Sequence, residues 1–480
     1  MSDYVRFIQR IGLVGVTNIL ISLSSLIFIP IITKNFTTAE YGVWAQVNTT
    51  IALVPNIANL GLPFTMVRFL SAEKDKNKIR ESFYPMMLVT FISTIIICGI
   101  FIIFGSPIAN GLFDGSMQIL YITTIISFFA CMNLMLISYF RTFQQMKRYS
   151  LYQILQSYIG VFVSIYLTYA GYPIETVVLG LLTGYVAVFI LMWLPIIRYL
   201  GFGSITFSHL KEQLDFAIPT IPSNVSSWIV DSSDKYVIGI FLGAVAVGCY
   251  SPGYALGSIL LMCLTPFAVL LPAVLPEHYE KGDLKQVDTY LSYSMKYYLL
   301  ITIPAAVGMS VLSKPLLFVI TTPEIALGGY MVTPLVCLGA VFMGMYGITN
   351  NILILDKNTK ILGKLWIAVA ISNIILNIIL VPYWGILGAA LATLLCYILA
   401  FIVTTIASKK VMKLPFNIKE TIKIIIASLI MGIIVYLTHP NGILSILISI
   451  IIGIIVYFIV IFLLKGITKK EIQFFKSLIK

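Results

Sequence analysis

The chain has 480 residues, of which 59% are hydrophobic and only 10% are charged. A soluble globular domain carries about 25% charged residues. The mean hydropathy of +0.99 leaves too little polar material to cover a surface that faces water. These values exclude a cytosolic enzyme, a disordered scaffold and a secreted disulfide domain. They predict an all-α integral membrane protein.

The cysteines and histidines do not indicate a metal or redox site. All six cysteines lie inside apolar runs, and no two form a CxxC pair. A disulfide framework or a zinc site needs ligands whose spacing lets them converge. The three histidines, His209, His278 and His439, fall in or beside connecting loops. We therefore expect no metal site and no histidine relay inside the membrane.

Long apolar runs predict about fourteen transmembrane helices, because a helix crosses the hydrocarbon core in about 20 apolar residues. The predicted spans cover residues 11–33, 41–66, 82–104, 118–140, 151–170, 174–197, 213–242, 245–274, 289–312, 326–354, 361–381, 384–407, 419–438 and 442–464. The first run is long and lacks a small-residue cleavage site, so we expect an uncleaved span and not a signal peptide.

Lysine and arginine concentrate in one set of loops, which the positive-inside rule places in the cytoplasm. This set includes both chain ends, whereas the opposite loops hold only Lys34 and Lys314. We therefore expect a multi-pass protein of the plasma (inner) membrane with both termini cytoplasmic. The net charge of +12 is then a topology signal and does not indicate nucleic-acid binding. Residues 465–480 are expected to form a cytoplasmic basic tail, either amphipathic on the membrane or solvated.

An internal repeat is indicated by residues that recur at a nearly constant distance. Asn18 and Asn224 are 206 residues apart, and so are Gly42 and Gly248. Two hairpins, at 171–173 and 382–385, and two basic turns recur at about 210 residues. A structural alternative is that both glycines only permit a tight outer turn into the next helix.

The repeat predicts a division into two six-span lobes and a trailing segment. The lobes cover residues 1–198 and 199–410, and spans 13 and 14 fall within 411–464. Because six is even, the two lobes enter the membrane in the same direction. Such parallel repeats suit alternating access between two lobes.

The span at 213–242 carries the strongest functional candidates, because charged residues inside a span are costly. Asn224, Ser227/Trp228, Asp231 and Asp234/Lys235 recur at intervals of three or four residues and so share one helical face. Two prolines precede them and should kink the helix. In the functional interpretation, Lys235 binds a substrate phosphate, and Asp231 and Asp234 bind sugar hydroxyls or a coupling cation. In the structural alternative, Asp231 and Lys235 form an internal ion pair.

Three further residues are candidates for substrate binding. Asn18 shares a face of the first span with serines that could equally join helices. Arg68 ends the second span and could meet a phosphate or serve as a positive-inside anchor. Lys296, in the ninth span, faces a cavity or extends its ammonium group to the membrane surface.

No pattern in the sequence indicates a catalytic residue. The single Gly-Lys pair is followed by Leu365, so there is no nucleotide-binding GxxxxGK[ST] loop. No HExxH motif or nucleophile elbow is present, and the predicted outer loops are too short for a catalytic domain. We expect a transporter rather than an enzyme, with no cofactor apart from H⁺ or Na⁺ as candidate coupling ions.

Two segments together resemble a known family. They are the end of the first span, IFIPIITKNFTTAEYGVWA, and PSNVSSWIVDSSDKYVIGIFLGAVAVGCYSPGYALG in the seventh. With the lobes and trailing helices, they resemble the Wzx-type oligosaccharide flippases. These form the polysaccharide-transporter branch of the multidrug/oligosaccharidyl-lipid/polysaccharide exporter superfamily. The most specific block is Ser-Ser-Asp-Lys-Tyr around Lys235. Where the family usually has an Arg and then Leu-Gly, this chain has Lys34-Asn35-Phe36.

The resemblance implies a V-shaped pair of lobes around a cationic cavity. It also implies a flippase that moves a polyprenyl-(pyro)phosphate-linked oligosaccharide to the outer leaflet, for surface polysaccharide or glycan assembly. The expected partners are this lipid-linked oligosaccharide, membrane lipids and glycan-assembly proteins. The energy source would be the substrate gradient, an ion or the membrane voltage.

Three alternatives stay open. A lipid II-type flippase would be expected to carry several arginines in its cavity, and Arg68 is the one candidate. A cation-coupled multidrug exporter would be expected to carry carboxylates deep in the first half, and none lies deep within spans 1 to 6. A polymerase or ligase acting on lipid-linked sugars would need larger outer loops.

Overall fold

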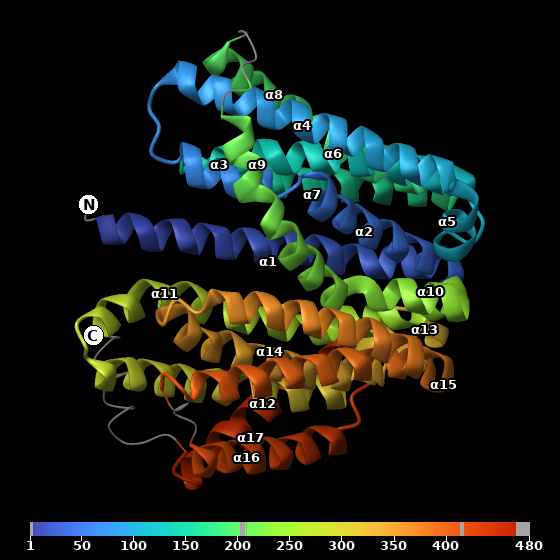
Figure 1. Cartoon of the computed structure of the whole chain (residues 1–480). Coiled ribbons are helices and arrows are strands. Elements are labelled where there is room, and N and C mark those ends of the chain that lie inside the picture. Colours follow the sequence, from blue (N-terminus) through green and yellow to red (C-terminus); the bar gives the residue numbers. More distant parts are fainter. Residues whose placement is uncertain (1–2, 202–206, 208, 413–416, 467–480) are drawn as a thin grey trace. The chain divides into compact units, whose positions relative to one another are not determined.

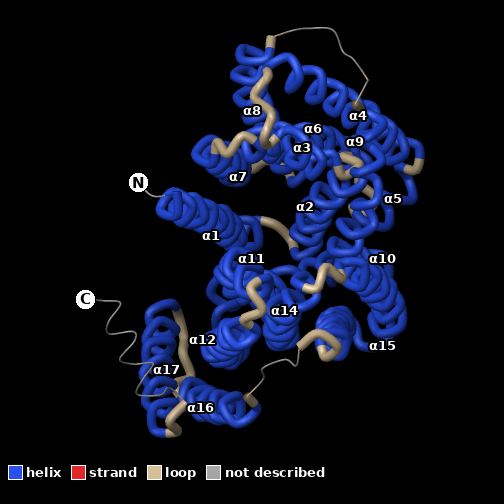
Figure 2. Tube along the Cα trace, turned by 60° about the vertical axis from the view of Figure 1, so that its left-hand side comes forward, coloured by secondary structure: helices blue, strands red, loops and turns tan. Residues whose placement is uncertain are grey.

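The computed structural model describes residues 3–201, 207, 209–412 and 417–466. These residues form seventeen α-helices and two 3-10 helices, and this part of the chain contains no strand (Figures 1 and 2). A helix satisfies its backbone hydrogen bonds within one segment, which a lipid environment requires. The prediction of an all-α protein is confirmed. The predicted basic tail lies, beyond Gly466, outside the described residues.

The chain divides into two compact units, residues 1–248 and 249–480. Helices of the first unit are α1 (Asp3–Asn35), α2 (Thr38–Ala58), α3 (Leu62–Leu70), α4 (Lys76–Ile103), α5 (Gly105–Leu112), α6 (Met117–Thr142), α7 (Met146–Tyr169), α8 (Ile174–Leu200), α9 (Leu210–Ala217) and η1 (Ile218–Thr220). Helix α10 (Ile221–Ser258) crosses the boundary. Those of the second unit are η2 (Ile259–Leu264), α11 (Thr265–Glu280), α12 (Leu284–Ile320), α13 (Pro323–Gly329), α14 (Val332–Leu355), α15 (Thr359–Ser408), α16 (Ile418–Leu437) and α17 (Ile443–Leu463).

The unit boundary falls inside α10 and not near residue 198, because the first half of α10 packs against α2. The six-span lobes stay a prediction.

Eleven described helical segments are long and apolar enough to cross a membrane, or twelve if the bent pair α2 and α3 is one span. Two of these segments, Leu210–Glu280 and Lys360–Ser408, are far longer than one crossing needs. Each contains a non-helical glycine, Gly243 or Gly385, at or close to a predicted turn between spans. A count of fourteen transmembrane spans requires that both segments break at these glycines. That count stays a prediction.

The second predicted span, 41–66, is not one straight helix. Helices α2 and α3 meet at a bend of 53°. Gly61 has φ +75 at this bend, and Pro63 lies in the first turn of α3, so the helix stops and restarts. A Cβ on Gly61 would collide with the carbonyl of Ala217 and with Thr220 Oγ1. The bend therefore packs directly against the end of α9 and the 3-10 turn η1, just before α10.

Two prolines around the start of α10 separate it from α9, as the sequence predicts. Helix α9 ends at Ala217, and the 3-10 turn η1 contains Pro219 before α10 begins with Ile221 and Pro222. Proline cannot donate the backbone hydrogen bond that an α-helix needs, so the chain tightens into a 3-10 turn here.

In the first unit, small residues allow α7 and α8 to lie close together. A Cβ on Gly180 would collide with Ser164, and a Cβ on Gly184 with the carbonyl of Gln156. Close backbone approach at small residues is a common way for membrane helices to associate. This contact fixes the side chains of α7 and α8 that line a pocket described below.

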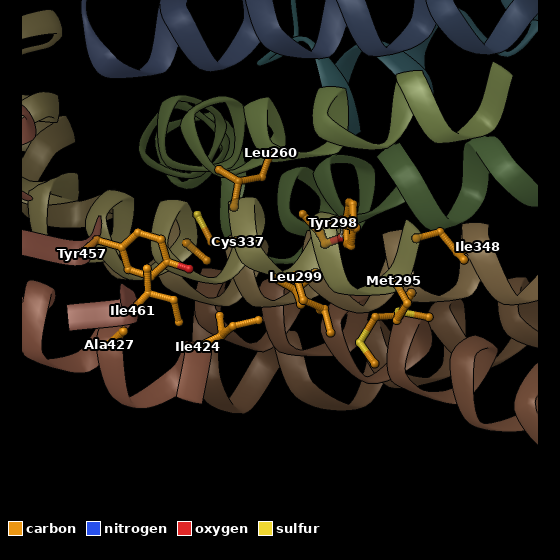
Figure 3. Close-up of a cluster of buried hydrophobic side chains, with 14 of the residues drawn as sticks. Leu260, Met295, Tyr298, Leu299, Cys337, Ile348, Ile424, Ala427, Tyr457 and Ile461 are labelled. Carbon is orange, nitrogen blue, oxygen red and sulfur yellow. Dashed lines mark hydrogen bonds between the residues drawn. The ribbon is translucent and has the colours of Figure 1, made fainter. Parts of the chain in front are cut away.

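In the second unit, the trailing helices α16 and α17 pack against α12. Figure 3 shows the buried cluster formed by Leu260, Met295, Tyr298, Leu299, Cys337, Ile348, Ile424, Ala427, Tyr457 and Ile461. Both tyrosine hydroxyls in the cluster are satisfied. Tyr298 Oη donates to the carbonyl of Ala340 at 2.7 Å, and Tyr457 Oη donates to that of Leu300 at 2.9 Å.

Candidate functional site

Helix α10 carries the main candidates for substrate binding. It crosses α2 with almost no side chain between the two backbones. A Cβ on Gly42 would collide with the carbonyl of Ala244, and a Cβ on Gly248 with that of Thr38. Neither glycine has a positive φ, whereas Gly243 does, at +81. The structural alternative, in which the two repeated glycines only permit a tight outer turn, is therefore wrong. They form a helix crossing, and the turn lies at Gly243.

Beside this crossing, polar groups join α2 to α10. Gln46 Nε2 donates to the backbone carbonyl of Lys235 at 2.6 Å. Thr50 Oγ1 and Tyr236 Oη are hydrogen-bonded at 2.8 Å, and Thr50 Oγ1 also donates to the carbonyl of Gln46. Gly239 leaves the room that the Gln46 amide occupies. Buried polar contacts of this kind hold membrane helices together.

Sequence analysis missed Gln46, Thr50 and Tyr236. A buried glutamine with a threonine four residues later, inside an apolar span, is the signal that could have found the first two.

The four candidates on α10 differ in exposure. Asp234 is completely buried, Lys235 and Asn224 are half-buried, and Asp231 is exposed. The Lys235 backbone N–H donates to Asp234 Oδ1 at 2.8 Å, and the two side chains interact electrostatically. A buried carboxylate needs such compensation, because transferring a bare charge out of water is costly. The α10 candidates thus place one carboxylate inside the protein and one at its surface.

The candidates on α1 and α3 lie at the surface. Asn18 is exposed, and so is Arg68 in the last turn of α3. Among the described residues, neither side chain has a hydrogen bond or ion pair to the α10 group. Other residues make polar contacts between α1 and α7. Ser24 Oγ lies 2.5 Å from Ser157 Oγ, and Tyr158 Oη donates to the carbonyl of Leu20 at 3.1 Å. Ser24 is buried, and sequence analysis did not single it out.

Lys296 forms an ion pair between α12 and the first turn of α16. Its Nζ lies 3.4 Å from Glu420 Oε2, and the two side chains are only 10% and 29% exposed. This pair joins a trailing helix to the core of the second unit. It supplies a structural role for Lys296 that the sequence did not indicate, because Glu420 is 124 residues away along the chain.

Reversing the charge of Lys296 is expected to destabilise the protein, and reversing both partners is expected to restore it. Lys296→Glu places two carboxylates together and should cost about 1–3 kcal/mol, between the values for exposed and for fully buried ion pairs. Adding Glu420→Lys recreates the attraction with opposite polarity. The Tm of purified protein in detergent should fall in the single variant and recover most of the loss in the double variant. Equal Tm values for the two variants would contradict a structural ion pair.

A pocket of about 240 Å³ lies within the first unit, between α2, α6, α7 and α8. Its polar lining consists of amides and phenols, supplied by Asn56, Asn133, Tyr152, Gln153, Gln156 and Tyr185. We call it the amide pocket. Its described lining residues include no Asp, Glu, Lys or Arg.

Hydrogen bonds fix the wall of the amide pocket. Asn133 Nδ2 donates to Gln156 Oε1 and to the carbonyl of Tyr185, both at 2.9 Å. Asn133 Oδ1 is buried and accepts no hydrogen bond. Amides both donate and accept, so this wall can bind neutral hydroxyl groups without any charge. Sequence analysis missed Asn133 and Gln156, although amides inside apolar spans are an available signal.

A second cavity of the first unit, of about 360 Å³, lies where the predicted cytoplasmic loops meet α6 and α8. Lys74 and Arg148 line it together with Glu73. The Glu73 carboxylate accepts the backbone N–H groups of Asp75 and Lys74, each at 2.9 Å, and these bonds lower the pKa of Glu73. Arg148 is held by Gln145 at 2.9 Å. Lys74 and Arg148 can therefore receive an anion in this cavity, beside a carboxylate whose pKa is lowered.

The apolar helices and the hydrogen-bonded polar groups inside them define a multi-pass membrane protein. Comparison with known families then shows to which family it belongs. The sequence profile described as "Polysaccharide biosynthesis protein" matches residues 7–275, and the MatE profile matches residues 219–381. Because the first match covers more than half of the chain, the protein belongs to the polysaccharide biosynthesis protein family. The resemblance to the polysaccharide-transporter branch is thereby confirmed.

Curated relatives are similar over parts of the chain. "Probable low-salt glycan biosynthesis flippase Agl15" of Haloferax volcanii is 22% identical over 193 residues, which is 40% of each chain. "Probable flippase AglR" of the same organism is 24% identical over 51% of this chain and 52% of its own. "Lipid II flippase MurJ" of Thermosipho africanus is 32% identical over 33% of each chain. The chain thus spans about half or less of these relatives, all of which are named flippases and not enzymes.

Solved structures share the fold over most of the chain. A structure of "Lipid II flippase MurJ, inward closed conformation" has a TM-score of 0.77 and 23% identity, covering 98% of this chain and all of its own. An inward-facing multidrug resistance MATE transporter has a TM-score of 0.65 and 16% identity, covering 82% and 93%. The chain therefore has the multi-pass fold of these transporters.

Proposed function

We propose that this protein is a flippase for a polyprenyl-(pyro)phosphate-linked oligosaccharide. It moves this lipid from the cytoplasmic to the outer leaflet by alternating access of two lobes, for the assembly of surface polysaccharide or glycan. Family membership and the names of the relatives support the flippase class. Such a lipid needs a protein in order to cross the membrane, because a phosphate and a sugar chain cannot enter the hydrocarbon core without polar partners.

The amide pocket is the observation that carries the choice of substrate. Sugar hydroxyls both donate and accept hydrogen bonds, and the amides of Asn56, Asn133, Gln153 and Gln156 do the same. A cation-coupled exporter needs a group in this half that changes its charge. None of the described lining residues is acidic, so the pocket favours a neutral glycan over a drug cation.

The charged candidates complete the proposal. Lys235 binds the phosphate, while Asp231, Asp234 and Asn224 bind sugar hydroxyls. Asp231 is exposed and is also the candidate for H⁺ or Na⁺ coupling. Arg68, Asn18 and Lys296 are secondary candidates for substrate binding, the last with its ion pair to Glu420 as the structural alternative.

We further propose that the protein lies in the plasma (inner) membrane with both termini cytoplasmic. This orientation rests on the distribution of basic residues. Glycan-assembly proteins are its proposed partners at the outer face, because the flipped oligosaccharide must be taken up there.

Lipid mass spectrometry on a strain that lacks the gene tests the proposed function. A prenyl-linked oligosaccharide is expected to accumulate, and expression of the wild-type chain is expected to remove it. Accumulation follows because synthesis on the cytoplasmic face continues while export stops. The mass of the accumulated lipid identifies the glycan and the carrier.

Two outcomes contradict this proposal and favour an alternative. Accumulation of a peptidoglycan precursor would indicate the lipid II-type flippase, which the similarity to MurJ keeps open. Unchanged prenyl-linked lipids together with altered drug sensitivity would indicate a multidrug exporter.

A further inference from the structure

A large cavity of the second unit has a composition that the functions above do not use. Its volume is about 850 Å³, within the range of small-molecule sites. It lies between the C-terminal half of α12, Tyr330 before α14, and the connection from α16 to α17. The predicted topology places all of these segments at the outer end of the protein. We call it the α12–α16 cavity.

Lys314 supplies a positive charge to this cavity. It is exposed, and its Nζ lies 5.6 Å from the centre of the Tyr330 ring, which a cation–π contact positions. The positive-inside rule explains nearly every other basic residue of the chain, but it disfavours a lysine at this end. No described residue lining the cavity is Asp or Glu, so the charge is not neutralised within it.

The opposite wall presents hydrogen-bond donors from the turn between α16 and α17. His439 and Asn441 both line the cavity. His439 has φ +41, an uncommon conformation for a residue with a side chain, and its ring lies against Tyr436 at 5.6 Å between centres. The turn thus holds an imidazole and an amide on the wall that faces the α12 side with Lys314.

Apart from Ser310, Ser313 and two tyrosines, the remaining lining residues are apolar, and exposed apolar side chains continue beside them. Val311, Phe318 and Val435 line the cavity. Next to it, Leu437 at the end of α16 and Leu444 at the start of α17 are 65% and 73% exposed. A ligand with an anionic head and a hydrocarbon tail matches this arrangement, because the head meets Lys314 and the tail stays beside the apolar helices.

We propose that the α12–α16 cavity binds the phosphate headgroup of a prenyl phosphate lipid at the outer membrane surface. The inference rests on the proposed function, because a flippase for such lipids must release them at this end. Lys314 provides the charge–charge attraction, and His439 and Asn441 donate hydrogen bonds to the phosphate oxygens. Free phosphate shares this headgroup chemistry, so the test separates the two.

Binding of geranylgeranyl monophosphate to the purified full-length chain tests the proposal. The dissociation constant is measured in detergent for the wild type and for Lys314→Ala, His439→Ala, Lys314→Arg and Lys364→Ala. Each alanine variant of the cavity should weaken binding about tenfold, the usual loss when a hydrogen bond to a charged group is removed. Lys314→Arg should retain most of the affinity. Lys364→Ala removes an exposed lysine that lines none of the described cavities, and it should bind like the wild type.

Two further ligands complete the design. Geranylgeraniol has the tail without the phosphate, and its binding should not change between the variants. Inorganic phosphate should displace the lipid only weakly. Wild-type affinity in both alanine variants would overturn the proposal, and so would an equal loss for the alcohol. If inorganic phosphate bound as tightly as the lipid, this would contradict the claim that the cavity binds a lipid headgroup and not free phosphate. Because the assay needs no transport, its result is independent of whether lipids accumulate in the deletion strain.

Discussion

Replacing Gly42 with leucine is expected to prevent accumulation of folded protein. A Cβ at this position would collide with the backbone carbonyl of Ala244 and would approach Gly248 N to 3.0 Å. Backbone atoms of two helices cannot turn aside as a flexible side chain can. Overpacking a core usually costs about 1–3 kcal/mol. Here the cost should lie at or above the top of that range, because separating α2 from α10 also breaks the Gln46–Lys235 and Thr50–Tyr236 hydrogen bonds.

Gly99→Leu is the matched control for this prediction. Gly99 lies within helix α4, and a Cβ there would meet nothing within 4 Å. Fluorescence-detected size-exclusion chromatography of both variants measures the outcome. Gly99→Leu should elute as the wild type does, whereas Gly42→Leu should aggregate or be absent. Normal elution and an unchanged Tm for Gly42→Leu would refute the helix crossing.

Replacing Lys235 with alanine is expected to reduce transport by about tenfold or more while the fold is retained. An ammonium group attracts phosphate strongly where screening by water is weak, and alanine removes that attraction. The hydrogen bonds that Gln46 and Asp234 make to residue 235 use its backbone atoms, so alanine keeps them. The complemented deletion strain, assayed by lipid mass spectrometry, should therefore still contain the accumulated lipid.

Two companion variants separate substrate binding from a structural ion pair at Lys235. Lys235→Arg keeps the positive charge and should restore most of the transport. The combination of Asp234→Asn and Lys235→Gln removes both charges, and it should fold as the wild type does without recovering transport. Transport in this neutral double variant at the wild-type rate would show that Lys235 serves only to balance a buried carboxylate.

Local features of the fold could be predicted from the sequence. The last predicted span, 442–464, nearly coincides with α17 (Ile443–Leu463), because a continuous apolar run has clear ends. The 3-10 turn before α10 and the non-helical backbone at Gly243 and Gly385 were also indicated, since proline and glycine act on the backbone locally.

Contacts between distant segments could not be predicted in the same way. Gly42 and Gly248 were recognised as a related pair, but that they touch depends on how two helices cross. The partner of Lys296 is Glu420 in a helix outside the repeat, so neither spacing nor symmetry pointed to it. The amide pocket draws its polar lining from α2, α6, α7 and α8, and only packing brings those amides together.

The proposed flippase activity is tested most directly by the sidedness of the lipid in reconstituted vesicles. The prenyl-linked oligosaccharide that accumulates in the deletion strain would be purified and placed in proteoliposomes with the wild-type chain or with Lys235→Ala. A glycosidase added outside cleaves only the glycan of the outer leaflet. With the wild type, nearly all of the lipid should become cleavable, whereas empty liposomes should stop near half. With Lys235→Ala, the cleavable fraction should rise above half about tenfold more slowly, or slower still. A cleavable fraction that stays near half with folded wild-type protein, under imposed ion gradients and voltage as well as without them, would contradict the account.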